Sequence, residues 1–211
     1  MSLRNILSKI EKEAEERGEI KDDLYDAMRK ATRLSKQAIF LTHKGEFKNA
    51  KNQLKEAEKL FTKLDEVPVV HQKLVYAGIV DSAYQEFAEA HIFLNRVTRG
   101  KFISHERINV PSFSYLLGLA DVVGELRRRA LDSLREGKVK DAERSLETME
   151  LIYSELMVLD EAMHSVSELR RKLDIARRII EVTRGDVTID VRRSALERSI
   201  RKLEGSFRKK K

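Results

Sequence analysis

SYLLGLADVVGELRRRA, from Ser114 to Ala130, is the stretch around which this 211-residue chain is organised. Between Tyr115 and Leu126 the only charged residues are Asp121 and Glu125, so a helix formed here is apolar on nearly all sides. Such a helix is expected to be buried. The spacing i, i+4 places both acids one turn apart on one face. Because isolated buried carboxylates are unfavourable, we expect them to be paired, protonated or bound to a cation.

The rest of the chain has the composition of a helical protein. It contains two prolines and nine glycines and is dense in Leu, Ala, Glu, Lys and Arg, which favour helices. No Asn-Gly or Asp-Gly turn occurs, nor does a sustained alternation of period two, so strands and hairpins are not indicated. The sequence therefore predicts an all-α protein whose length suits one domain with a substantial core.

Apolar residues that recur every three or four positions predict a bundle of about seven helices with short connections. Glycines are expected to end several of these helices, among them Gly18 and Gly185. We expect one domain over 1–205 and a disordered basic tail over 206–211. The predicted helices cover about 2–16, 21–44, 46–64, 70–99, 112–135, 139–159, 166–184 and 189–204, with a single turn near His105 to Ile108.

The charge of the chain is compatible with a polyanionic partner. Lys and Arg number 42 against 35 Asp and Glu, a formal net charge of +7, although interspersed charges of both signs equally suit an ordinary soluble surface. The absence of cysteine excludes disulfides, thiolate metal sites and cysteine nucleophiles. No apolar leader and no run long enough to span a bilayer is present, so a soluble, cytoplasmic protein without membrane association is expected.

A second pair of acids lies in YQEFAEA, Tyr84 to Ala90. Glu86 and Glu89 are spaced i, i+3 and are therefore neighbours on a helix. If this helix faces the one that carries Asp121 and Glu125, the four carboxylates can converge on one or two divalent cations. Mg²⁺ or Mn²⁺ suits such oxygen ligands. Two ions held in this way would stabilise the entering and leaving oxygens of a phosphodiester hydrolysis.

Structural roles for these residues remain alternatives. Glutamate pairs often lie on solvated helix faces, and for Glu86 and Glu89 alone this is the better interpretation. The acids of the central stretch could pair with Arg127, Arg128 or a basic residue elsewhere, as a buried ion pair. Two glycines of the same stretch, Gly118 and Gly124, are expected to permit close helix packing rather than ligand binding.

Several segments together resemble the translin family, and specifically its translin-associated factor X branch in an archaeal-type form with a single kind of subunit. They are YLLGLADVVGELRR (Tyr115 to Arg128), YQEFAEA, RKLDIARRIIEVTRGDVT (Arg171 to Thr188) and RKATRLSKQAIFLTHKGEFKNA (Arg29 to Ala50). The resemblance covers most of the chain. It implies a helical bundle that assembles into octamer-like shells and binds RNA or DNA inside them.

The same resemblance implies that the chain is a metal-dependent endoribonuclease. In the factor X branch the catalytic acids lie in an E-x-x-E motif and in a D-x-x-x-E motif, while the translin branch binds nucleic acid without the full set. The matching positions here are Glu86, Glu89, Asp121 and Glu125. We therefore expect a homo-oligomer that binds RNA, with single-stranded DNA as a second candidate, and uses Mg²⁺ or Mn²⁺. A noncatalytic RNA- or DNA-binding scaffold is the alternative.

Basic residues for nucleic-acid binding are less sharply indicated. Arg29, Arg33 and Lys36 recur at i, i+4 and i+7 on one helix face and could follow phosphates, although a solvated face explains them equally well. Arg128 resembles a basic position that follows the acidic motif of the family. It could hold the scissile phosphate or neutralise the carboxylates. In the segment before E-x-x-E, where the family is basic and rich in histidine, Lys73 is the remaining candidate.

Overall fold

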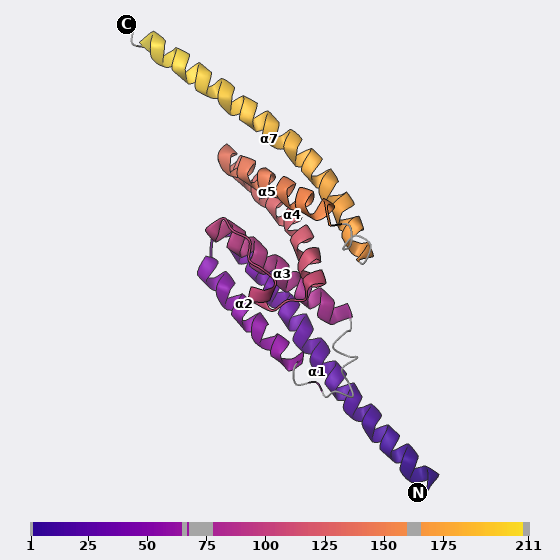
Figure 1. Cartoon of the computed structure of the whole chain (residues 1–211). Coiled ribbons are helices and arrows are strands. Elements are labelled where there is room, and N and C mark those ends of the chain that lie inside the picture. Colours follow the sequence, from indigo (N-terminus) through magenta and orange to yellow (C-terminus); the bar gives the residue numbers. More distant parts are fainter. Residues whose placement is uncertain (1, 65–66, 68–77, 160–165, 209–211) are drawn as a thin grey trace. The chain divides into compact units, whose positions relative to one another are not determined.

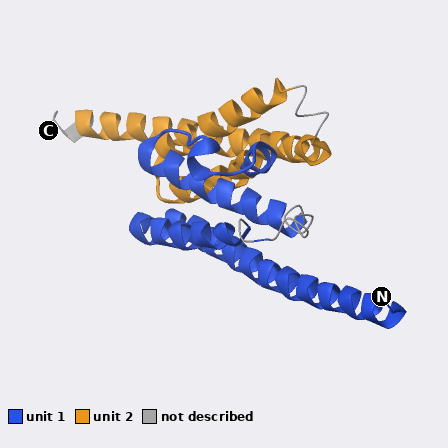
Figure 2. Ribbon diagram, turned by 60° about the horizontal axis from the view of Figure 1, so that its bottom comes forward, with its two compact units in different colours: residues 1–118 blue, residues 119–211 orange. Residues whose placement is uncertain are grey.

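A computed structural model of the chain describes residues 2–64, 67, 78–159 and 166–208 (Figure 1). These residues form six α-helices and two short 3₁₀ helices and contain no strand, which confirms the all-α prediction. They divide into two compact units, 1–118 and 119–211, which Figure 2 colours separately. The one-domain assignment over 1–205 stays a prediction.

The first unit is built on a long helix against which two shorter helices pack. α1 lies against both α2 and α3, and its core contains Met28, Leu54 and Phe93, each at most 2% exposed. Phe61 stacks on the Tyr84 ring with centroids 4.3 Å apart and joins α2 to α3. The elements are α1 (Leu3–His43), α2 (Phe47–Phe61), η1 (Thr62–Leu64), α3 (Gly78–Arg99), η3 (Glu106–Ile108) and the first residues of α4 (Ser112–Arg135).

The second unit contains the rest of α4 together with α5 (Val139–Met157) and α7 (Ser167–Arg208). α5 packs along α7. Ala130, Ala142 and Val187, one from each helix, form a shared apolar cluster. Small residues at the centre of this cluster allow the three helices to approach one another closely.

Two predicted helix breaks are wrong. α1 runs without interruption through Gly18 and α7 through Gly185, and neither glycine adopts the positive φ of Gly45 or Gly137, which end helices. A single glycine inside a helix costs only about 1 kcal/mol relative to alanine. At Gly185 the neighbouring turns are also held in place, because the Arg184 guanidinium lies 2.6 Å from a Glu150 oxygen on α5.

Most other boundaries agree with the sequence prediction. α4 begins and ends where the apolar pattern predicts, and the expected turn near residue 105 is η3. The predicted start of the third long helix, at residue 70, lies outside the described residues. α7 continues to Arg208, three residues into the segment 206–211 for which disorder is expected. Within the described part of the chain, no helix is both long and apolar enough to cross a membrane.

Candidate functional site

The first acidic pair lies on the middle turns of α3, within the first unit. Glu89 is 8% exposed and is the only buried charged residue in the described part of the chain. Glu86, one turn earlier, keeps 24% of its side chain exposed and faces α1, where its Oε1 lies 3.1 Å from Lys36 Nζ. The sequence predicts a solvated face for this pair taken alone, and the burial of Glu89 makes that prediction wrong for Glu89.

The start of α4 is fixed against α3 beside this pair. A Cβ on Gly118 would lie 2.6 Å from the Gln85 carbonyl oxygen and 2.9 Å from the Glu89 backbone nitrogen, so only glycine fits at this approach. The Tyr115 hydroxyl donates to the Ile103 carbonyl at 2.6 Å and ties the same turn to the preceding loop. Close packing is therefore confirmed for Gly118. For Gly124 it is wrong, because a Cβ there meets no described atom within 4 Å.

The second acidic pair follows on α4, within the second unit. Asp121 is half-buried, and its Oδ1 accepts a hydrogen bond from Lys172 Nζ at 2.7 Å. The Lys172 side chain is 14% exposed, and its Nζ also lies 3.7 Å from a Glu168 oxygen. Glu125 is half-buried. The helix around the pair is less completely buried than its apolar composition predicts: Val122, Val123 and Leu126 are buried, whereas Leu116, Leu117 and Leu119 are only half-buried.

From the sequence, pairing of Asp121 with a basic residue elsewhere in the chain is an open alternative. The structure contains such an ion pair, and the partner is Lys172 on α7. Arg127, a candidate partner by sequence, instead directs its guanidinium to the Ile179 carbonyl and the Thr183 hydroxyl, both at 3.4 Å. Arg128 is exposed. α4 is therefore bound to α7 by one cation on each helix.

Sequence reasoning missed the role of Lys172. The signal that could have revealed it is its position between Leu169 and Ala176, which are i−3 and i+4 from it and are both buried. A lysine beside an apolar stripe needs a carboxylate partner when its ammonium group is withdrawn from water.

The donor chemistry of the four acids fits Mg²⁺ or Mn²⁺, since all the side-chain donors are carboxylate oxygens. Over the ranges that the structure describes, however, no three Asp, Glu or His side chains are grouped closely enough to hold a metal ion. One acid of each pair is engaged by a lysine instead. A cation bound through Glu86 Oε1 or Asp121 Oδ1 would therefore compete with an ammonium group.

The predicted basic face is present on α1. Arg29, Arg33 and Lys36 are all exposed, while Met28 and Ala31 on the other side of the helix are fully buried. Lys36 belongs to this basic face, and its ammonium group also contacts the Glu86 carboxylate. Lys73 lies outside the described residues.

The all-helical arrangement is a translin-like fold, as comparison with solved structures shows. The crystal structure of apo-NeC3PO superimposes with a TM-score of 0.79 over 90% of this chain and 99% of that one, at 24% identity, a level at which the likeness concerns the fold alone. AfC3PO is 37% identical, with a TM-score of 0.74 over 87% of this chain and 96% of its own. A structure of AfC3PO with duplex RNA is 36% identical in sequence and has a TM-score of 0.73. The match covers 87% of this chain and 95% of that one.

The chain belongs to the Translin family, whose sequence model matches residues 19–182. It is also 30% identical over 190 residues to an uncharacterized protein of Methanocaldococcus jannaschii, covering 88% of this chain and 82% of that protein. The family match includes both acidic pairs, Lys172 and the basic face of α1.

Proposed function

We propose that this chain binds RNA and hydrolyses it as a divalent-metal-dependent endoribonuclease of the factor X type. The observation that carries the proposal is the burial of Glu89 one turn from Glu86. A buried carboxylate is normally paired, protonated or bound to a cation, and our proposal for Glu89 is that it binds a divalent cation. The relative AfC3PO, solved with duplex RNA, supports RNA as the substrate class.

Glu86, Glu89, Asp121 and Glu125 would hold Mg²⁺ or Mn²⁺. A bound ion would supply Lewis-acid stabilisation of the phosphate oxygens and lower the pKa of a coordinated water. Glu89, the least exposed of the four, is our candidate for the group that orients the attacking water and accepts its proton. Without the ion, Lys36 and Lys172 compensate the charges of Glu86 and Asp121.

The test is cleavage of end-labelled RNA by the purified chain with Mg²⁺, with Mn²⁺ or with EDTA. Asp121→Asn removes one proposed metal ligand, and we expect cleavage to fall at least about 100-fold. Asp132→Asn is the matched control, because Asp132 lies on the same helix but only pairs with Arg135, 3.4 Å away at the surface. Cleavage that persists in EDTA, or an equal loss in both variants, contradicts the assignment.

A further variant separates the two roles that Asp121 can have. Lys172→Met removes the ammonium group that competes with a metal ion for this carboxylate. If Asp121 is a ligand, this variant should cleave RNA at a lower Mg²⁺ concentration than the unmodified chain. If the Asp121–Lys172 pair is only structural, both substitutions should lower the thermal stability alike, and neither should change the metal dependence.

The second candidate function is a noncatalytic RNA- or DNA-binding scaffold. The lysine partners of Glu86 and Asp121 favour it, since acids in structural ion pairs need no metal. A scaffold predicts salt-sensitive binding that ignores EDTA and no cleavage under any metal condition.

We further propose a homo-oligomer, an octamer by family resemblance. Apolar side chains that are 55% or more exposed recur at one end of α1 and along α7, and such faces suit burial between copies. They are Leu3, Leu7, Ile10, Ile189, Leu196 and Leu203. Light scattering of the purified chain measures the subunit count, and a monomer would contradict the proposal.

A further inference from the structure

A cavity of about 500 Å³ lies entirely within the first unit. It is bounded by α2, by the C-terminal half of α3 and by the segment that includes Ile103 and η3. None of the four acids lines it, and neither do the described candidates for RNA binding, Arg29, Arg33, Lys36 and Arg128. Its size is in the range of sites for small organic ligands.

The floor of the cavity is apolar. Leu54, Leu94 and Ile108, which come from three elements, line it and are 2 to 5% exposed. His91 lies among them, with its ring held edge-on against Phe87 at a centroid distance of 4.5 Å. A flat, weakly polar group such as a nucleobase fits a floor of this kind.

The rim of the cavity is basic. Lys51 and Lys55 stand one turn apart on α2, Arg99 ends α3 and Arg107 lies on η3, whereas Glu58 is the only carboxylate among the described lining residues. Four cations from three elements around one opening match a phosphate monoester, which carries a charge between −1.5 and −2 at neutral pH. The lining thus combines an apolar floor with an anion-attracting rim.

Two polar side chains of the lining present hydrogen-bond acceptors. The Asn95 amide nitrogen donates to the Lys101 carbonyl at 2.7 Å, and the Thr98 hydroxyl donates to the Leu94 carbonyl at 2.7 Å. One N–H of Asn95 and the hydroxyl hydrogen of Thr98 are thus engaged, while the oxygens of both side chains keep acceptor capacity and Asn95 keeps its second N–H. They are suited to the amino group of a base such as adenine.

From this lining we propose that the cavity binds a nucleoside monophosphate, with the base on the apolar floor and the phosphate at the basic rim. The ligand is either a free nucleotide or the 5′-phosphorylated end of an oligonucleotide, since both carry the same chemistry. The site is separate from the four acids and does not depend on their activity.

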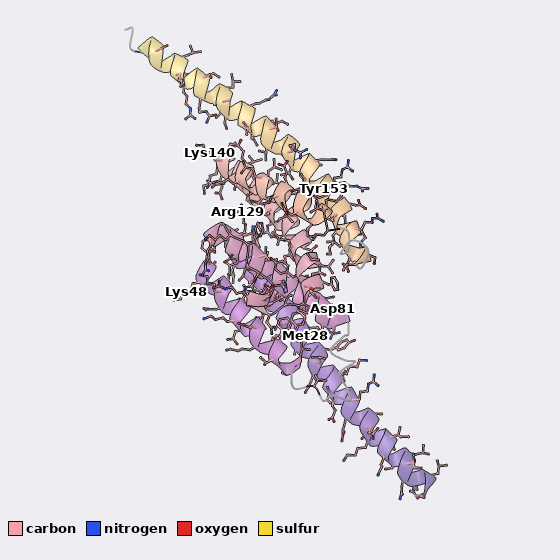
Figure 3. The ribbon with its side chains drawn as sticks, in the orientation of Figure 1. Met28, Lys48, Asp81, Arg129, Lys140 and Tyr153 are labelled. Atoms are coloured by element: carbon pink, nitrogen blue, oxygen red, sulfur yellow. The ribbon has the colours of Figure 1, made fainter. Side chains whose placement is uncertain are left out.

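Calorimetric titration of the full chain in EDTA tests the proposal with three probes: 5′-AMP, adenosine and inorganic phosphate. We expect 5′-AMP to bind at least tenfold more tightly than either fragment. The double variant Lys51→Gln/Lys55→Gln should weaken 5′-AMP binding at least tenfold. Its control is Lys48→Gln/Lys63→Gln, which removes the same charge from exposed lysines that do not line the cavity and should change binding less than twofold. Figure 3 labels Lys48 on α2.

The outcomes separate this proposal from the nuclease. Inorganic phosphate that binds as tightly as 5′-AMP, or an equal loss in both double variants, overturns the site, because general charge attraction then explains the binding. Competition by a 5′-phosphorylated but not a 5′-hydroxyl oligonucleotide identifies an RNA end as the ligand, and its absence identifies the free nucleotide. Since the titrations contain EDTA, a failure of metal-dependent cleavage does not affect them.

Discussion

At the scale of single residues, lysines provide the positive charge beside the acids of both pairs. Lys36 reaches Glu86 from α1, and the 14%-exposed Lys172 reaches Asp121 from α7. An ammonium group and a divalent ion satisfy the same electrostatic need, but only the ion can activate a water. If these acids bind a metal ion, as we propose, a displaceable ammonium group would limit repulsion between neighbouring carboxylates when the ion is absent.

His91 makes the stability of the first unit depend on pH. Its pKa is lowered to about 4 by burial, while an unfolded histidine keeps the ordinary value of 6.5. Between these values the unfolded chain binds a proton that the folded chain does not, so the free energy of unfolding falls as the pH is lowered through this window. The expected contribution is a loss of about 2 kcal/mol between pH 7 and pH 5.

Urea unfolding of the chain and of His91→Gln at these two pH values measures this contribution. The variant should lose less stability than the unmodified chain over the interval, because glutamine does not titrate. Parallel pH dependence in the two proteins would show that the ring is protonated in the folded state.

At the scale of elements, α4 carries Asp121 and Glu125 and contacts other helices through different residues. Gly118 brings it against the backbone of α3 beside Glu89, and Arg127 binds it to α7. The approach at Gly118 leaves no room for a Cβ, since the obstructing atoms belong to the backbone. Side chains can adopt other rotamers to relieve a clash, but a helix backbone can only shift as a whole.

Alanine substitutions at the two glycines of α4 should have opposite effects. Gly118→Ala forces α3 and α4 apart and should lower the free energy of unfolding by about 1 to 3 kcal/mol. Gly124→Ala adds a Cβ in open space, so it should raise this free energy by about 0.5 to 1 kcal/mol through helix propensity. Denaturant unfolding of both variants is the measurement, and equal effects would show that the helices are not in contact at Gly118.

The sequence predicts where the helices lie more accurately than where they end. It also identifies the four acids, but not the lysine that pairs with Asp121. The apolar pattern locates α4 correctly because both of its ends carry strong signals, Pro111 before it and Gly137 after it. It fails at Gly18 and Gly185, where helix formers on both sides outweigh one glycine. The four acids stand out as charges in apolar segments. Lys172 does not, because its carboxylate partner lies 51 positions away on another helix.

At the scale of the whole molecule, the net charge of +7 should attract RNA over long range, but it does not determine where RNA binds. The exposed face of Arg29 and Arg33 is the specific candidate. Each phosphate contact releases condensed counterions, so the slope of log affinity against log salt counts the contacts. Arg29→Gln/Arg33→Gln should reduce the magnitude of this slope by about 1.4 for single-stranded RNA and weaken binding most at low salt.

Arg4→Gln/Lys9→Gln is the matched control for this face, because it removes the same charge from exposed positions near the start of the same helix. If RNA follows the face at Arg29 and Arg33, the control should leave the slope nearly unchanged, since distant exposed charges are screened within about 10 Å at 0.1 M salt. If the slope of log affinity against log salt falls equally in both double variants, the affinity for RNA depends only on the total charge of the chain. The residues that contact RNA would then have to be sought elsewhere on the chain.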